Sequence, residues 1–293
     1  MENNLQKKKT YLNQMILNLN LDKILLPLDG SLESEISIPY AAMLSRWFNG
    51  EIMLLHVLPE NPIAAVERSG NVSYPDEQHD RGEILAKSYL EAIIDTIAPQ
   101  GIKARWGIST GSESEMIISR TESNSIGVIA IATKLKSKIR RVFFNNLLNE
   151  LFRKTNIPIL VINTNNIDVK VLKPLPPKVI ISQVNKSISD ENINRIIAIC
   201  MGSKSKLIFI SKKRENLLPS KLIDLVEKNE IEYEIKIAQK STNNEIDKMN
   251  ELNNEFWTIS TLSKYSGINR IIHDRFSFEI LKKSKTPTII LPN

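Results

Sequence analysis

Residues 126–163 read IGVIAIATKLKSKIRRVFFNNLLNELFRKTNIPILVIN, and residues 255–293 read EFWTISTLSKYSGINRIIHDRFSFEILKKSKTPTIILPN. Each stretch contains an apolar strand pattern, a basic loop, a helical pattern and a proline that opens a second apolar run. Aligned without a gap, the two stretches place identical residues opposite each other, among them Ser137 and Ser266, Ile139 and Ile268, Arg141 and Arg270, Glu150 and Glu279, and Pro158 and Pro287. A repeat of this length predicts two copies of one domain.

The first half of the chain, through residue 163, alternates apolar strand patterns with amphipathic helix patterns. We expect strands at 23–28, 51–58, 103–109, 126–132 and 158–162, and helices at 32–48, 81–97, 112–121 and 146–154. The helix at 81–97 is expected to turn Ile84, Leu85, Tyr89, Ile93 and Ile94 inward. Strict alternation of strands and helices predicts an α/β fold, with a parallel sheet covered by helices on both faces.

The second half of the chain repeats this order more briefly. Strands are expected at 178–182, 206–211, 232–238, 256–262 and 288–291, and helices at 190–201, 219–229, 243–252 and 276–283. The alternating stretch EYEIKI at 232–237 is typical of an edge or half-exposed strand. We therefore divide the chain into an N-terminal extension (1–20), a first domain (21–163), a proline-containing linker (164–177) and a second domain (178–293). The extension is expected to be either mobile or a short docking helix.

The last strand of each domain is short and apolar, and an exposed apolar edge strand favours association unless it is paired. Residues 159–162 and 288–291 hold these two edges in one chain. We expect them to pair antiparallel and to give an intrachain pseudo-dimer.

Composition limits the class of protein. The chain of 293 residues carries a net charge of +6, and all of the excess lies in residues 166–293, where 21 Lys and Arg face 15 Asp and Glu. No apolar run is long enough for a membrane span, which needs about 18 residues. Cys200 is the only cysteine and lies in an apolar helical run, so we expect a buried, inert thiol. Without a disulfide framework or an export signal, the expected location is the cytoplasm.

The first half resembles the universal stress protein family. The residues that carry the resemblance are ILLPLDGS at 24–31, EIMLLHVLP at 51–59, TGSESEMI at 110–117 and the stretch 128–162. The second half resembles the family more weakly, through its closing segment and its order of elements. The resemblance implies two tandem open parallel sheets of Rossmann-like type, similar to the adenine nucleotide alpha hydrolases.

The resemblance also implies a nucleotide site at the carboxyl ends of the strands, where open parallel sheets hold ligands. If the site is retained, it consists of Pro27, Leu28, Asp29, Val57, Ala132, Lys136, Ser137, Lys138, Asn145 and Asn146. Asp29 matches the acidic position beside the ribose. The family's glycine-rich phosphate loop is not matched, because residues 128–163 contain no glycine. Glycine lets backbone N–H groups approach phosphate oxygens, so a degenerate cradle is expected.

Three functions stay open at this point. The first is a non-enzymatic stress-response or regulatory module that binds an unidentified partner protein or a small anionic ligand, with no catalytic residue, no metal and no expected cofactor. The second is a member that binds ATP in the first domain and hydrolyses it slowly. The third is association with nucleic acid through the basic second half. We disfavour the third, because aromatic residues do not interleave with the lysines as stacking surfaces for single strands require.

Overall fold

The computed structural model describes residues 2–60, 65–66, 72–73, 75–134, 146–165, 176–183, 188–211, 218–237, 256–261, 281 and 285–292. The statements below concern these residues. Two expected helices, 243–252 and 276–283 apart from Leu281, lie outside them. We call residues 2–165 the first half and residues 176–292 the second half.

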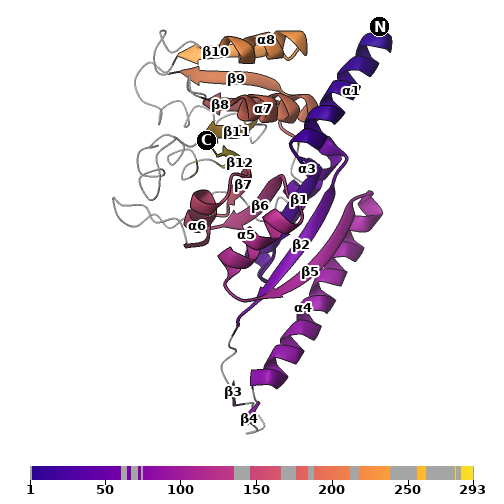
Figure 1. The fold of residues 1–293 in the computed structure, drawn as a ribbon, viewed down its shortest axis with the longest axis vertical. Coiled ribbons are helices and arrows are strands. Elements are labelled where there is room, and N and C mark those ends of the chain that lie inside the picture. Colours follow the sequence, from indigo (N-terminus) through magenta and orange to yellow (C-terminus); the bar gives the residue numbers. More distant parts are fainter. Residues whose placement is uncertain are drawn as a thin grey trace.

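A single sheet of ten strands runs through both halves (Figure 1). Its order is β10-β9-β8-β11-β12-β7-β6-β1-β2-β5. The strands are β1 (Lys23–Pro27), β2 (Glu51–Leu58), β5 (Lys103–Thr110), β6 (Val128–Thr133), β7 (Ile159–Asn163), β8 (Val179–Gln183), β9 (Lys206–Ser211), β10 (Tyr233–Ile237), β11 (Phe256–Thr261) and β12 (Thr288–Leu291). Two further short strands, β3 (Ala65–Val66) and β4 (Val72–Ser73), form a separate antiparallel pair.

The two halves share one topology. In the first half β1 lies between β2 and β6, and β7 closes the inner edge. In the second half β8 lies between β9 and β11, and β12 closes the inner edge. All neighbours within a half pair in parallel, whereas β12 and β7 pair antiparallel, with Thr288 opposite Val161 and Ile290 opposite Ile159. The antiparallel pair expected between residues 159–162 and 288–291 is therefore present, and it joins the halves into one sheet.

Helices cover both faces of the sheet. They are α1 (Glu2–Asn18), α2 (Leu32–Glu35), α3 (Ile38–Phe48), α4 (Pro75–Ile97, followed by a 3₁₀ turn at Ala98–Gln100), α5 (Glu113–Ser123), α6 (Asn146–Lys154), α7 (Asp190–Ser203) and α8 (Ser220–Lys228). Alternate residues of β1 point to opposite faces, so Leu26 joins a core that extends to Trp257 of β11, while Leu25 joins a second core beneath α6. The first of these cores spans both halves.

Two expectations about helices were wrong. The single helix expected at 32–48 is split into α2 and α3 at Ile36 and Ser37, because Pro39 in the first turn of α3 has no N–H to continue an earlier helix. In α4, Ile84 and Leu85 are exposed, at 65% and 70%, and the helix buries Ala86 and Leu90 instead. Tyr89, Ile93 and Ile94 pack against the core as expected, so the expectation was wrong for Ile84 and Leu85 only.

Other expectations agree with the structure. β10 is the outer edge of the sheet and is largely exposed, as the alternation at 232–237 predicted. The N-terminal extension is a docking helix, since Lys8 of α1 pairs with Glu230 and Lys228 lies 5.3 Å from the centre of the Tyr11 ring. Cys200 is buried, and burial raises the pKa of its thiol.

Candidate functional site

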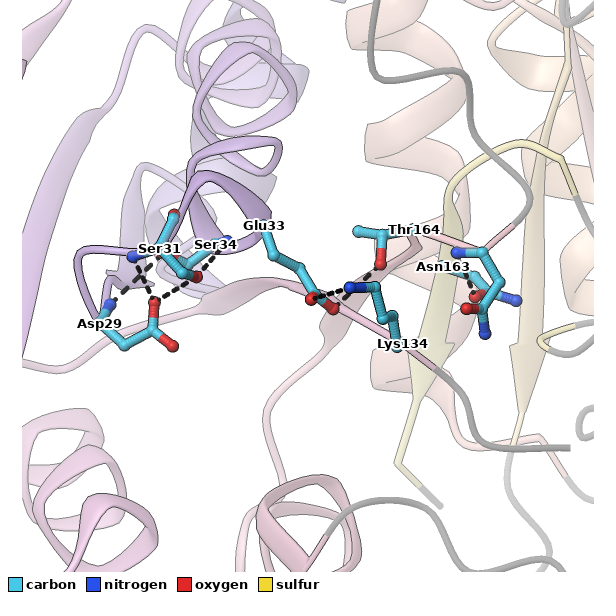
Figure 2. Close-up of polar contacts among 8 residues, drawn as sticks. Asp29, Ser31, Glu33, Ser34, Lys134, Asn163 and Thr164 are labelled. Atoms are coloured by element: carbon cyan, nitrogen blue, oxygen red, sulfur yellow. Dashed lines mark hydrogen bonds and ion pairs between the residues drawn. The ribbon is translucent and has the colours of Figure 1, made fainter. Parts of the chain in front are cut away.

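Asp29 lies two residues after the end of β1 and is held in a fixed turn. Its Oδ1 accepts hydrogen bonds from the backbone N–H of Ser31 at 2.9 Å and from the Ser31 hydroxyl at 2.6 Å (Figure 2). The Ser31 hydroxyl oxygen in turn accepts from the N–H of Ser34 at 3.1 Å and caps α2. Gly30 between them has a φ of +82°, which glycine adopts without strain. Both bonds reach Oδ1, so Oδ2 takes no part in the contacts with Ser31.

A second contact fixes the residue before Asp29. The Nδ1 of His56 lies 2.8 Å from the carbonyl oxygen of Leu28, and since a carbonyl only accepts, the imidazole donates. The Leu28 N–H donates to the carbonyl of Leu55 at 2.8 Å. Leu28 is therefore bound to β2 through both its N–H and its carbonyl oxygen, and this fixes the chain just before Asp29.

Two cavities flank Asp29. The first, of about 240 Å³, lies over the ends of β1 and β2, and the second, of about 220 Å³, lies between the ends of β1 and β6. Pro27, Asp29 and Glu113 line both. The first adds Leu28, Leu55, Val57, Pro59 and Gly111, and the second adds Ser31, Glu33, Ser34, Ile131, Ala132, Thr133 and Leu147. The chain order reverses between β1 and β6, which is where open α/β sheets bind ligands.

The described walls of the cavities are acidic. Partial burial raises the pKa of Asp29, but the hydrogen bonds from Ser31 and Ser34 outweigh it, so the pKa lies below its ordinary value and the carboxylate stays charged. For Glu113, at the start of α5, desolvation and then the negative charge of Asp29 hold the pKa above its ordinary value. A ligand in these cavities therefore meets the charged, fixed carboxylate of Asp29 and the carboxyl group of Glu113, which takes up a proton more readily than an ordinary glutamate.

A third carboxylate, that of Glu33, is paired. Its Oε2 lies 3.1 Å from the Nζ of Lys134, and its Oε1 accepts a hydrogen bond from the Thr164 hydroxyl at 3.0 Å (Figure 2). Lys134 directly follows β6, and Thr164 directly follows β7. The pair thus lies next to the strand ends, with Glu33 in the wall of the second cavity.

The structure brings together half of the residues predicted for the site. Pro27, Leu28, Asp29 and Val57 line the first cavity, and Ala132 lines the second. Asn146 is the first residue of α6, next to Leu147 of the cavity wall. Lys136, Ser137, Lys138 and Asn145 lie outside the described residues.

Among the residues that the sequence reasoning missed, those that set the charge of the site are Glu33, Glu113, Lys134 as an ion-pair partner, and Thr164, which holds Glu33. Glu113 had an available signal, because it lies in the stretch TGSESEMI and follows a strand at the ligand-binding edge. Glu33 and Thr164 had none, since 131 positions separate them in the sequence and only the fold brings them together.

Two kinds of feature were sought in the described part of the chain and not found there. Its His, Cys, Asp and Glu residues form no group of three or more that could hold a metal ion. None of its helices combines the length and the hydropathy that crossing a membrane requires.

Comparison with known proteins decides the family of the first half. Residues 20–163 match the model of the Universal stress protein family. Through this domain, the chain belongs to the universal stress protein family. Universal stress protein MJ0577 of Methanocaldococcus jannaschii is 24% identical over 156 residues, which cover 49% of this chain and 96% of that protein. Universal stress protein YxiE of Bacillus subtilis is 21% identical over 145 residues, which cover 48% of this chain and 98% of that protein.

A solved structure extends the comparison to both halves. The crystal structure of a universal stress protein from Archaeoglobus fulgidus has a TM-score of 0.72 and covers 92% of this chain and 98% of that chain, at 17% identity. At this identity the likeness concerns the fold. The Rossmann-like universal stress protein fold is thus present in the second half as well as in the first.

Proposed function

We propose that this chain is a non-enzymatic binding module of the universal stress protein type, whose first half holds the nucleoside part of an adenine nucleotide. The observation that carries the proposal is the fixed carboxylate of Asp29 between two cavities at the strand ends. Each cavity is smaller than the range of about 300–1,000 Å³ that is usual for small-molecule sites. The nucleoside would therefore have to occupy both cavities. Oδ2 of Asp29 would then accept hydrogen bonds from ribose hydroxyls.

The same geometry argues against tight binding of a triphosphate. Phosphate oxygens in the second cavity would lie near Glu33 and Glu113. Negative charges at short range repel each other, which weakens binding of the phosphates. Lys134, which follows β6 beside this cavity, is already paired with Glu33. The loop that follows lacks glycine, so its backbone is poorly suited to wrapping phosphates. We therefore propose that the nucleotide site is degenerate at its phosphate end.

Asp29 suits recognition better than proton transfer. A base needs a pKa near the working pH, whereas hydrogen bonds hold the pKa of Asp29 below its ordinary value. The non-enzymatic assignment, an unidentified partner protein and a cytoplasmic location are parts of this proposal. Lysines of the second half pair with carboxylates, Lys206 with Glu232 and Lys221 with Asp190, which favours a solvated basic surface over a nucleic-acid interface.

Replacing Asp29 tests the proposal. Asp29→Asn keeps an oxygen for Ser31 but removes the charge, and a hydrogen bond to a charged group contributes about 1.5–3 kcal/mol. We expect the dissociation constant for adenosine, measured by calorimetry on the full chain, to rise at least about tenfold. Asp95→Asn, at an exposed position of α4, is the matched control and should leave adenosine binding unchanged. Equal adenosine affinity of the Asp29 variant and the unaltered chain would remove the basis of the proposal.

A further inference from the structure

The ion pair of Glu33 and Lys134 lies beside the second cavity, on the side where the proposed function places the phosphates. Glu33 lines this cavity, and its Oε2 is 3.1 Å from the Lys134 Nζ. Lys134 is the first residue after β6 and begins the run KLKSKIRR at 134–141. Glu33 therefore places an internal anion against Lys134, a cation beside this cavity.

A second contact holds Glu33 in this position. The Thr164 hydroxyl donates to Oε1 of Glu33 at 3.0 Å, and the Thr164 N–H donates to the Thr133 carbonyl at 3.1 Å. One carboxylate oxygen is thus held from the end of β7 and the other faces the lysine. The carboxylate is positioned from two strand ends, which distinguishes it from a freely rotating surface glutamate.

The pair is open enough to exchange partners. The Lys134 side chain is 64% exposed and that of Glu33 is 30% exposed, so water screens the attraction between them. A phosphate carries more charge than a carboxylate and offers three acceptor oxygens, so it competes well for an exposed ammonium. To bind Lys134, a ligand phosphate must displace the Glu33 carboxylate, and the displaced carboxylate then repels the phosphate from nearby.

We propose that Glu33 is a specificity-determining residue that occupies Lys134 in place of a ligand phosphate and so selects nucleosides over nucleotides. This inference rests on the proposed function, because it assigns a role within the same site. Glu33 acts on the phosphate end only. Asp29 is fixed by hydrogen bonds that it accepts from Ser31 and by one that its N–H donates to the Ser34 hydroxyl oxygen, and Glu33 takes no part in them.

Glu33→Gln tests this role. Glutamine has nearly the same shape and keeps an oxygen for Thr164, but it releases Lys134 and removes one negative charge from the cavity wall. We expect the dissociation constant for ATP to fall about tenfold and that for adenosine to stay unchanged. The gain should shrink as NaCl is added, because screening weakens the freed attraction. Glu122→Gln, an exposed glutamate of α5 that lines neither cavity, removes the same charge and should leave both constants unchanged.

A second variant assigns the gain to the lysine. In the double variant Glu33→Gln with Lys134→Gln, ATP binding should return close to that of the unaltered chain. If adenosine binds and Glu33→Gln leaves the ATP constant unchanged, the role of Glu33 is refuted while the nucleoside site stands. If neither compound binds any variant, both proposals fail. If Glu33→Gln and Glu122→Gln strengthen ATP binding equally, general charge explains the gain and the specific role of Glu33 is refuted.

Discussion

Trp257→Ala is expected to destabilise the whole chain by about 3–5 kcal/mol, the usual cost of truncating a buried large aromatic residue. Trp257 belongs to β11 of the second half and is 1% exposed. Its ring centre lies 4.9 Å from that of Trp47 and 6.0 Å from that of Tyr40, both on α3 of the first half. The alanine would therefore open a cavity between a strand of one half and a helix of the other.

The loss should reach both halves, because they share this core. Urea denaturation followed by circular dichroism should show one transition at a lower midpoint, and amide exchange in β1 should accelerate together with exchange in β11. Ile235→Ala, at a position of β10 that is 49% exposed in the same half, is the control and should cost less than about 0.5 kcal/mol. Two separate transitions, with β1 exchanging at its original rate, would show that the halves fold independently.

Gly127→Ala is expected to cost about 3 kcal/mol, at the upper end of the usual range for overpacking. A Cβ added at Gly127 would lie 2.1 Å from the carbonyl oxygen of Asn20 and 2.3 Å from its carbon. Both are backbone atoms, so the strand or the turn must move. The Gly127 N–H also donates to the Lys23 carbonyl at 3.0 Å, which limits how far β6 can retreat from β1.

This change should affect the site as well as stability. The β1–β6 register, with Ile24 opposite Val128 and Leu25 opposite Ile129, sets Ala132 across the second cavity from Asp29. We expect adenosine to bind Gly127→Ala more weakly and denaturation to occur at lower urea.

Gly82→Ala is the matched control. Gly82 lies within α4, and a Cβ added there would lie 3.5 Å from a methyl carbon of Leu58 in β2. The substitution should therefore be neutral or stabilising by up to about 1 kcal/mol. Equal stability of the two variants would contradict the close approach at Asn20.

Much of the fold could be predicted where apolar runs are bounded by clear turn residues. The bounds expected for β2, β9, α6 and β12 are those of the structure. The sequence failed where a choice depended on packing. The apolar pattern of residues 81–97 fits more than one helix face, and only the position of α4 on the sheet decides that Leu90 is buried and Leu85 exposed.

The candidate site could be predicted only along the strand that carries its motif. Asp29 was accessible because it follows an apolar strand and matches a family position, and its neighbours Pro27 and Leu28 followed from it. The Glu33–Lys134–Thr164 contacts were not accessible, because three separate segments contribute one residue each. The charge of the second cavity depends on this convergence, which no single stretch of the sequence reveals.

The most direct test of the account compares adenosine and ATP on the unaltered full chain by calorimetry in the presence of Mg²⁺. We predict that both bind and that their dissociation constants lie within about tenfold of each other, because the triphosphate adds little free energy at an acidic site beside which Lys134 is already paired with Glu33. ATP binding more than about a hundredfold tighter than adenosine would contradict this account, since the phosphates would then supply most of the discrimination.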